Sequence, residues 1–235
     1  MCQYAVAELR SAPEQAPSST LSSPDRGQPR GDILTPTTDD DEIDLAFPKS
    51  TVEPMSFGQT TIWLPYVSLE NKTAYNCTTT YQLRGPLDID RFELALHAVI
   101  RRNSSLRTAF FTDEASGEVF QRVEASSPFQ LRQVAAAPFE SAAAEIEAEK
   151  KLVADHEYDL ERGDNFIATL LIHGDSPASV HTIIFGYHHI IMDGVSWQLY
   201  LQDLHRCYSA IDPDAVPPVG QYINFAAHQR RSLES

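Results

Sequence analysis

The stretch FGYHHIIMDGVSW, residues 185–197, places two adjacent histidines and an Asp-Gly pair directly after a run of apolar and β-branched residues. The apolar run that ends at Tyr187 predicts a buried strand. Apolar residues after it recur at helical spacing: Trp197, Tyr200, Leu201, Leu204 and Tyr208. The histidines are therefore predicted on a short loop between a buried strand and an amphipathic helix, two elements that fix both ends of the loop.

Upstream of this loop, strand and helix patterns alternate. The segments FIATLLIH (166–173) and SVHTIIFGY (179–187) indicate two strands joined by the turn-forming GDSPA. Before them, SAAAEIEAEKKLVADHEY (141–158) is rich in Ala, Glu and Lys and predicts a helix. Glu147 and Lys151, four residues apart, form a supporting ion pair in that interpretation.

Further upstream, LDIDRFELALHAVIRRN (87–103) has one apolar helical face and Asp88 as a plausible N-cap. LRTAFF (106–111) and VFQRV (119–123) flank TDEASGE and predict a hairpin. The chain thus has the alternation of helices and strands that is typical of a mixed fold.

Residues 1–50 differ in kind from the rest. They are rich in Pro, Ser, Thr and acidic residues, so they cannot bury enough apolar area to offset the entropy lost on ordering. We expect residues 1–50 to be a disordered, acidic, Ser/Pro-rich linker and residues 51–235 to be a folded domain. The acidic run is interpreted as a solvating segment: Asp39, Asp40, Asp41, Glu42 and Asp44.

The overall composition narrows the class of protein. The 235 residues are 42% hydrophobic and 22% charged, which suits one substantial core. Lys and Arg number 18 against 33 Asp and Glu, and the net charge of -15 argues against nucleic-acid binding. The cysteines Cys2, Cys77 and Cys207 are odd in number and far apart, so no disulfide framework is expected. With neither a signal-peptide pattern nor a long apolar run, we expect a cytoplasmic protein without membrane contact.

The paired histidines indicate proton-transfer chemistry. An imidazole has an unperturbed pKa near 6.5, so at neutral pH it can accept a proton from an attacking amine or hydroxyl. One histidine suffices for this, and the other is expected to help fix the loop. Asp193 would orient the rings or pair with a distant cation, and Gly194 would permit a tight turn or close approach of a ligand. A G-x-S-x-G nucleophile frame is absent, so direct transfer without a covalent intermediate is favoured.

Two alternatives remain open from the residues alone. His188, His189 and Asp193 could supply metal ligands, although adjacent residues point in different directions and no H-E-x-x-H pattern completes a set. Both rings could instead only satisfy hydrogen bonds in the core. Neither G-x-x-x-x-G-K-[ST] nor G-x-G-x-x-G occurs, so a nucleotide site is not predicted.

The stretch YHHIIMDGVSW resembles the H-H-x-x-x-D-G signature of the condensation domains of nonribosomal peptide synthetases, which are relatives of chloramphenicol acetyltransferase. MSFGQTTIWL resembles the family's opening motif, and LRTAF resembles the end of its second motif. The matching positions are Ser56, Gln59, Trp63, Leu106, Arg107, Thr108 and Phe110. YDLERG and QYINFAAHQ also fit in order and spacing. The sequence around PMSFGQ looks most like that of the condensation domains of fungal polyketide-peptide hybrid synthases.

This resemblance implies an α/β fold, an α+β sandwich in which a mixed β-sheet with flanking helices forms one chloramphenicol acetyltransferase-like lobe. It implies an acyltransferase that forms an amide bond between an acyl thioester and an amino acid. His189 would be the catalytic residue, while His188, Asp193 and Gly194 would shape the supporting loop. Acyl carrier and peptidyl carrier domains would be the partners and would bring the substrates on 4'-phosphopantetheine, so no cofactor or metal is expected to bind directly.

Two departures from the family pattern raise a second hypothesis. Where the second motif normally reads Arg-His-Glu, this chain has Arg102, Asn103 and Ser104, which removes two ionisable groups. The chain also ends at Ser235, so the family's second lobe, which supplies a cationic partner for Asp193, is expected to be absent. The first hypothesis is a catalytic N-terminal lobe that is inactive in isolation. The alternative is a non-catalytic remnant or carrier-docking module of the same fold.

Overall fold

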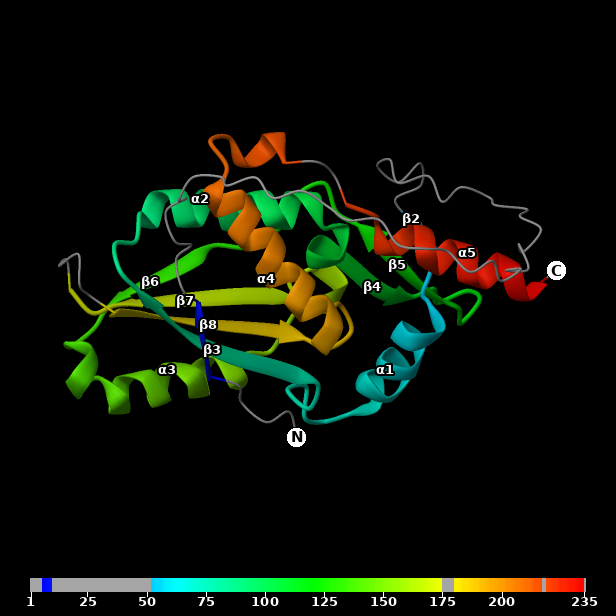
Figure 1. The fold of residues 1–235 in the computed structure, drawn as a ribbon. Helices are drawn as coiled ribbons and strands as arrows, with labels where there is room; N and C mark the ends of the chain where they lie inside the picture. The colour runs from blue at the N-terminus through cyan, green and yellow to red at the C-terminus, as the bar shows by residue number, and fades with distance from the viewer. Residues whose placement is uncertain (1–5, 10–51, 175–179, 217–218, 235) are drawn as a thin grey trace, which may run out of the picture.

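The computed structural model describes residues 6–9, 52–174, 180–216 and 219–234, which form two β-sheets and the helices around them (Figure 1). The strands are β1 Val6–Leu9, β2 Val52–Pro54, β3 Asn76–Arg84, β4 Thr108–Thr112, β5 Val119–Val123, β6 Leu131–Ala135, β7 Phe166–Ile172 and β8 Val180–His188. The α-helices are α1 Phe57–Ser68, α2 Ile89–Arg102, α3 Ala143–Ala154, α4 Gly194–Ser209 and α5 Tyr222–Glu234.

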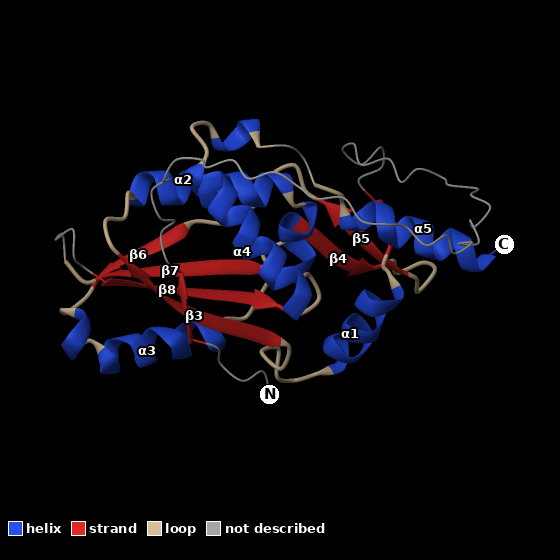
Figure 2. Ribbon diagram, in the orientation of Figure 1, coloured by secondary structure: helices blue, strands red, loops and turns tan. Residues whose placement is uncertain are grey.

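The larger sheet is mixed and has the strand order β1-β3-β8-β7-β6. β8 lies at its centre and runs antiparallel to both β3 and β7, whereas β1 and β6 pair in parallel with β3 and β7. Helix α3 covers one face of this sheet, and α2 and α4 cover the other (Figure 2). Because both faces are covered, β8 is buried along almost its whole length, as the sequence predicts.

The smaller sheet has the order β2-β5-β4 and is antiparallel. Helices α1 and α5 lie beside it at the end of the molecule away from α3 (Figure 1). The N-terminus of α1 is tied to α5, because Gln229 Oε1 accepts from Phe57 N at 3.1 Å and Arg230 Nε donates to Met55 O at 2.7 Å. These bonds fix α5 against the junction between β2 and α1.

Most of the predicted elements are confirmed. Asp88 caps α2 by accepting from Arg91 N at 3.0 Å, and β4 and β5 form the predicted hairpin. Helix α3 is shorter than predicted and ends at Ala154. The expected pair of Glu147 with Lys151 is wrong: Glu147 pairs with Lys150 at 2.7 Å, one residue closer along the helix, and Lys151 pairs with Asp155.

The two faces of β8 are packed differently. Tyr187 stacks on Trp197 of α4 and Phe185 meets the same ring edge to face, with ring centroids 5.2 and 5.3 Å away, respectively. Gly186 faces α3, where a Cβ would lie only 2.5 Å from Val153 Cγ1. The absence of a side chain at Gly186 therefore lets α3 approach the centre of the sheet.

The predicted linker at residues 1–50, with its acidic run, lies outside the described residues except for Val6–Leu9, which form β1. The GDSPA turn lies outside them from residue 175 onward. Among the helices that the structure describes, none combines the length and the apolar character that crossing a bilayer requires.

Candidate active site

The histidine loop begins where β8 ends, and its backbone is fixed by the neighbouring strands. The N–H of His188 donates to Asn165 O at 3.1 Å, next to the start of β7. The N–H of His189 donates to Tyr75 O at 2.9 Å, just before β3. The predicted short loop between a buried strand and a helix is confirmed for His189, whereas His188 is still the last residue of β8. The hydrogen bonds to the neighbouring segments hold both residues in place.

His188 is fully buried and packs among tyrosine rings, with centroids 4.9 Å from Tyr66 and 6.4 Å from Tyr158. Its Nδ1 accepts from Ile190 N at 3.2 Å, which assigns the neutral ring proton to Nε2. Burial, together with the neighbouring His189, lowers the pKa of His188 to about 4. His188 is therefore neutral at physiological pH and holds the loop against the sheet.

His189 is only half-buried and lines a cavity. Its Nδ1 lies 3.0 Å from Met192 O, and since a carbonyl oxygen can only accept, Nδ1 carries the proton. Nε2 then has a lone pair, and no hydrogen bond to Nε2 occurs within the described parts of the chain. This is the tautomer that a general base requires.

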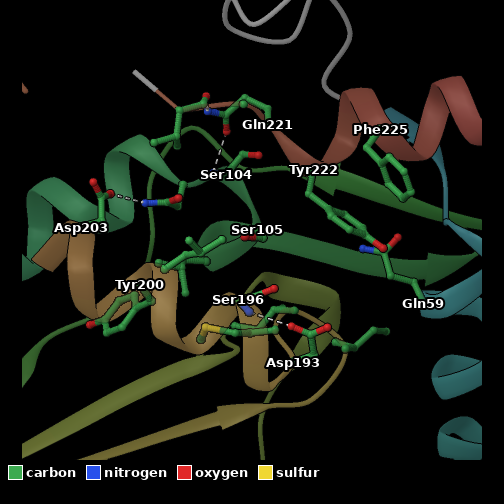
Figure 3. Close-up of a pocket in the computed structure, with 18 of the residues that line it drawn as sticks. Gln59, Ser104, Ser105, Asp193, Ser196, Tyr200, Asp203, Gln221, Tyr222 and Phe225 are labelled. Carbon is green, nitrogen blue, oxygen red and sulfur yellow. Dashed lines mark hydrogen bonds between the residues drawn. The ribbon is translucent and has the colours of Figure 1, made fainter. Parts of the chain in front are cut away.

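Asp193 is the N-cap of α4. Its Oδ1 accepts from Ser196 N at 2.8 Å, a bond drawn in Figure 3, and its carbonyl accepts from Trp197 N at 2.9 Å. Hydrogen bonds from Ser196 lower the pKa of Asp193, and the nearby His189 contributes more weakly. Asp193 thus starts the helix that follows the histidine loop. Asp193 is not among the ion pairs formed within the ranges that the structure describes.

Gly194 is the first residue of α4, and the structure does not require glycine there for a turn. Its φ is outside the left-handed region, and a Cβ at this position would meet no atom within 4 Å. The expectation of a tight turn at Gly194 is therefore wrong, because the helix begins there with ordinary backbone geometry. The second expectation, close approach of a ligand, stays a prediction.

The cavity beside His189 has a volume of about 680 Å³ (Figure 3). Its walls come from α1, from the 3-10 turn Ser104–Arg107, from the histidine loop, from α4 and from the start of α5. Apolar side chains such as Ile62, Leu199 and Phe225 share the lining with polar and charged residues, among them Gln59, Asp193 and Arg206. A pocket of this size and character is typical of a small-molecule site.

One wall of the cavity is held by a polar network. Arg102 pairs with the buried carboxylate of Asp203, with NH2 3.0 Å from Oδ1 and Nε 3.2 Å from Oδ2. Asn103 Nδ2 adds a third donor to Asp203, at 3.0 Å. Gln221 accepts from Ser104 N at 2.9 Å and donates to Arg102 O at 2.9 Å. The network joins the end of α2 to α4 and to the residue that precedes α5, and Figure 3 shows the bond between Ser104 and Gln221.

Several cavity residues were not identified from the sequence. Gln221, Tyr222 and Phe225 lie in QYINFAAHQ, which matched the family only as a motif without an assigned role. Gln59 lies in the capping box of α1, since Ser56 N donates to its Oε1 at 2.9 Å. The spacing Ser-x-x-Gln before an apolar run was the signal that could have located this helix start.

The metal interpretation finds no ligand set. Within the described residues, no group of three or more His, Cys, Asp and Glu side chains converges in a way that could hold an ion. His188 and His189 have their Nδ1 atoms engaged with Ile190 N and Met192 O, respectively. The two adjacent rings thus contact different groups and do not converge on one metal-binding centre.

Comparison with known proteins gives a consistent result. The family model described as "Condensation domain" matches residues 49–235. A polyketide synthase-nonribosomal peptide synthetase hybrid, himA of Aspergillus japonicus, is 46% identical over 217 residues, which cover 92% of this chain and 5% of the relative. The hybrid synthetase psoA of Aspergillus fumigatus is 42% identical over 184 residues, covering 77% of this chain and 4% of that protein. The chain thus spans only a small part of the length of these relatives.

Solved structures agree on the fold. The condensation domain from the monacolin K polyketide synthase MokA superposes with a TM-score of 0.65 at 24% identity, covering 78% of this chain and 39% of that chain. The α/β architecture expected from the sequence, a mixed sheet with flanking helices, is confirmed by this similarity.

Proposed function

Since the chain belongs to the condensation-domain family, we propose that it contributes His189 to a site for amide-forming acyl transfer between two carrier-bound substrates. The observation that carries the proposal is the state of the His189 ring. Its Nδ1 is bound to Met192 O, its Nε2 remains an acceptor, and the residue lines the cavity of about 680 Å³. The relatives named as hybrid synthetases suggest a polyketide acyl group as donor.

In the proposed reaction, the amine of the aminoacyl group attacks the carbonyl carbon of the acyl thioester. A new C–N bond forms, and Nε2 of His189 accepts the proton that the amine loses. The tetrahedral intermediate then breaks its C–S bond, and His189 passes the proton to the departing thiolate, which leaves as a thiol. An α-amine with a pKa of about 7.7–8.0 is already partly neutral at pH 7, so the hydrogen bond to Nε2 also positions the amine.

The other loop residues act as supports. His188 is buried and neutral, with its Nδ1 bound to Ile190 N, so it anchors the loop and takes no proton from the substrate. Asp193 caps α4 through Ser196 N and thereby sets where the loop ends. These contacts keep His189 at the wall of the cavity.

The substrates would arrive on 4'-phosphopantetheine arms of acyl carrier and peptidyl carrier domains, which makes the arms part of the substrates. A phosphopantetheine arm is a thin chain, and the cavity wall offers half-exposed, largely apolar residues that suit it. These are Leu199 of α4 and Tyr222 and Phe225 of α5. No cofactor bound directly by this chain enters the proposal.

We further propose that a second lobe completes the site, which would make the present chain inactive alone. The chain covers only 39% of the condensation-domain structure from MokA. Val195 and Leu199 of α4 are 72% and 59% exposed, beside the cavity. Positioning of two reactants can contribute about 7–11 kcal/mol, so loss of half of the site would outweigh the loss of the base.

The test is product formation from an acyl carrier and an aminoacyl carrier. It compares this chain alone, the chain with a second lobe supplied, and the His189→Ala variant with that lobe. We expect product only with both lobes, and a rate about 10²–10⁴-fold lower for His189→Ala. His205→Ala, an exposed position on α4, is the matched control and should keep full activity.

Equal rates for the wild-type protein and His189→Ala, with both folded, would overturn the catalytic assignment. The second candidate function is a non-catalytic module that docks carriers, favoured by the neutral Asn103 and Ser104 at the cavity wall. Carrier binding without product in the two-lobe mixture would support that alternative.

A further inference from the structure

Ser104 differs from its neighbours because its backbone groups form hydrogen bonds within the fold, whereas its side chain forms none. Its N–H donates to Gln221 Oε1 at 2.9 Å, and its carbonyl accepts from Thr108 Oγ1 at 2.8 Å. The residue is 2% exposed and lines the cavity, yet its hydroxyl has no hydrogen-bond partner within the described residues. Buried hydroxyl groups are normally satisfied, so this one calls for an explanation.

The neighbouring Asn103 is different. Its side chain donates to Val99 O at 2.9 Å and to Asp203 Oδ2 at 3.0 Å, so a change there would break the network that joins α2 to α4. Position 104 is thus a place on this wall where side-chain size can change without the loss of a side-chain hydrogen bond. Because both of its backbone groups are held by hydrogen bonds, a larger side chain at 104 would have to displace its packed neighbours or extend toward the cavity.

The wall around Ser104 carries no unpaired buried charge. The Asp203 carboxylate is neutralised by the two-point contact with Arg102. A charged substrate group placed against this wall would lose water without gaining a partner, which is strongly unfavourable. The remaining lining includes the apolar Ile62, Leu199 and Phe225, and its other charged side chains, Asp193 and Arg206, are exposed rather than buried. The space next to Ser104 therefore suits a neutral and largely apolar group.

We propose that Ser104 determines specificity: its short side chain keeps this wall open for a neutral, largely apolar group of one substrate. The inference rests on the proposed function and deepens it by naming the substrate class and the residue that sets its size. The group could belong to the acyl chain or to the amino acid, and the experiment separates these sources.

The test measures, by titration, the binding of thioesters of N-acetylcysteamine to this chain with the second lobe of the two-lobe assay supplied. One arm compares acetyl with octanoyl, and another compares alanyl with leucyl. For Ser104→Leu we expect Kd to rise about tenfold or more for the larger member of one arm and about threefold or less for its smaller member. Ser104→Ala, which preserves the space, should keep all Kd values within about threefold.

Thr79→Val is the matched control, because Thr79 on β3 also has a buried hydroxyl without a partner but does not line the cavity. It should leave every Kd unchanged. A third arm compares octanoyl with a chain of the same length that ends in a carboxylate, which we expect to bind at least about tenfold more weakly. Denaturant unfolding of each variant checks the fold, and Ser104→Val provides a smaller increase in volume should Ser104→Leu not fold.

Equal weakening of large and small probes, or no weakening of any, would overturn the proposal, as would a wild-type chain that binds none of them. Failure of the proposed function has a different signature, namely product formation that does not depend on His189 in the two-lobe assay. Size selection by position 104 in the binding assay can hold even then, so the two failures are distinguishable.

Discussion

The side of the histidine loop that faces the sheet and the side that faces the cavity differ in burial more than their adjacent positions in the sequence suggest. The sheet side, Gly186 and His188, is enclosed by α3 and a set of tyrosine rings. The cavity side consists of His189, Asp193 and Gly194. His189 and Asp193 line the cavity, and Gly194 is exposed with open space around the position of a Cβ. The comparison teaches that adjacent residues can have different roles. Residues on one side anchor the strand in the core, while those on the other side place reactive groups at the cavity.

The largest stability difference should separate the two histidines. We expect His188→Ala to lower the free energy of unfolding by roughly 3 kcal/mol, because it leaves a cavity among packed rings. His189→Ala removes one half-buried hydrogen bond and should cost about 1 kcal/mol or less. Urea unfolding of the two variants measures both values. Equal losses would break the distinction between the sheet side and the cavity side.

The same distinction should appear in the pH dependence of stability. The pKa of His188 is about 4 in the folded chain, against about 6.5 when unfolded, so the unfolded state binds more protons between these values. The stabilisation is complete above pH 6.5 and is lost as pH falls towards 4, by about 3 kcal/mol in total.

Unfolding measured from pH 7 to 4 tests this expectation against His188→Phe, which cannot ionise. The difference in pH dependence between the wild-type protein and His188→Phe isolates the histidine from the carboxylates that also titrate in acid. Parallel profiles for the two proteins would contradict the assignment of a buried neutral ring.

The two glycines provide a smaller contrast. Gly186→Ala places a Cβ 2.5 Å from Val153 Cγ1 and 2.7 Å from Tyr158 Oη, so we expect a loss of about 1–3 kcal/mol as α3 is displaced. Gly194→Ala meets no atom within 4 Å at a helical position, so it should be neutral or stabilising by up to about 1 kcal/mol. Thermal unfolding compares the stabilities of the two variants. A larger loss for Gly194→Ala than for Gly186→Ala would show that the packing of α3 is looser than described.

The smallest expected effect concerns the cap of α4. Asp193→Ala should cost about 1 kcal/mol, because Ser196 N loses its acceptor. Asp193→Asn keeps a capping oxygen and should recover most of the loss, which chemical denaturation can resolve. If Asn were as destabilising as Ala, the charge of Asp193 would matter more than its role as a cap.

The sequence by itself determined the local elements around the site. Apolar and β-branched residues predicted β8, helical spacing predicted α4, and the placement of Asp88 predicted the start of α2, all confirmed. These features are encoded within a few residues, because strand and helix periodicities and caps depend on near neighbours along the chain. The same local signals correctly placed His189 between a strand and a helix, although His188 is the last residue of the strand itself.

Only the tertiary structure decided what surrounds each of those residues. Nothing in the sequence says that His188 is enclosed by Tyr66 and Tyr158, or that Asp203 receives Arg102 from 101 residues away. Gln221 reaches Ser104 across 117 residues, and that contact places α5 at the cavity. Local patterns state which face of an element is apolar but not which distant element covers it, so burial, pairing and the cavity itself arise when the layers pack.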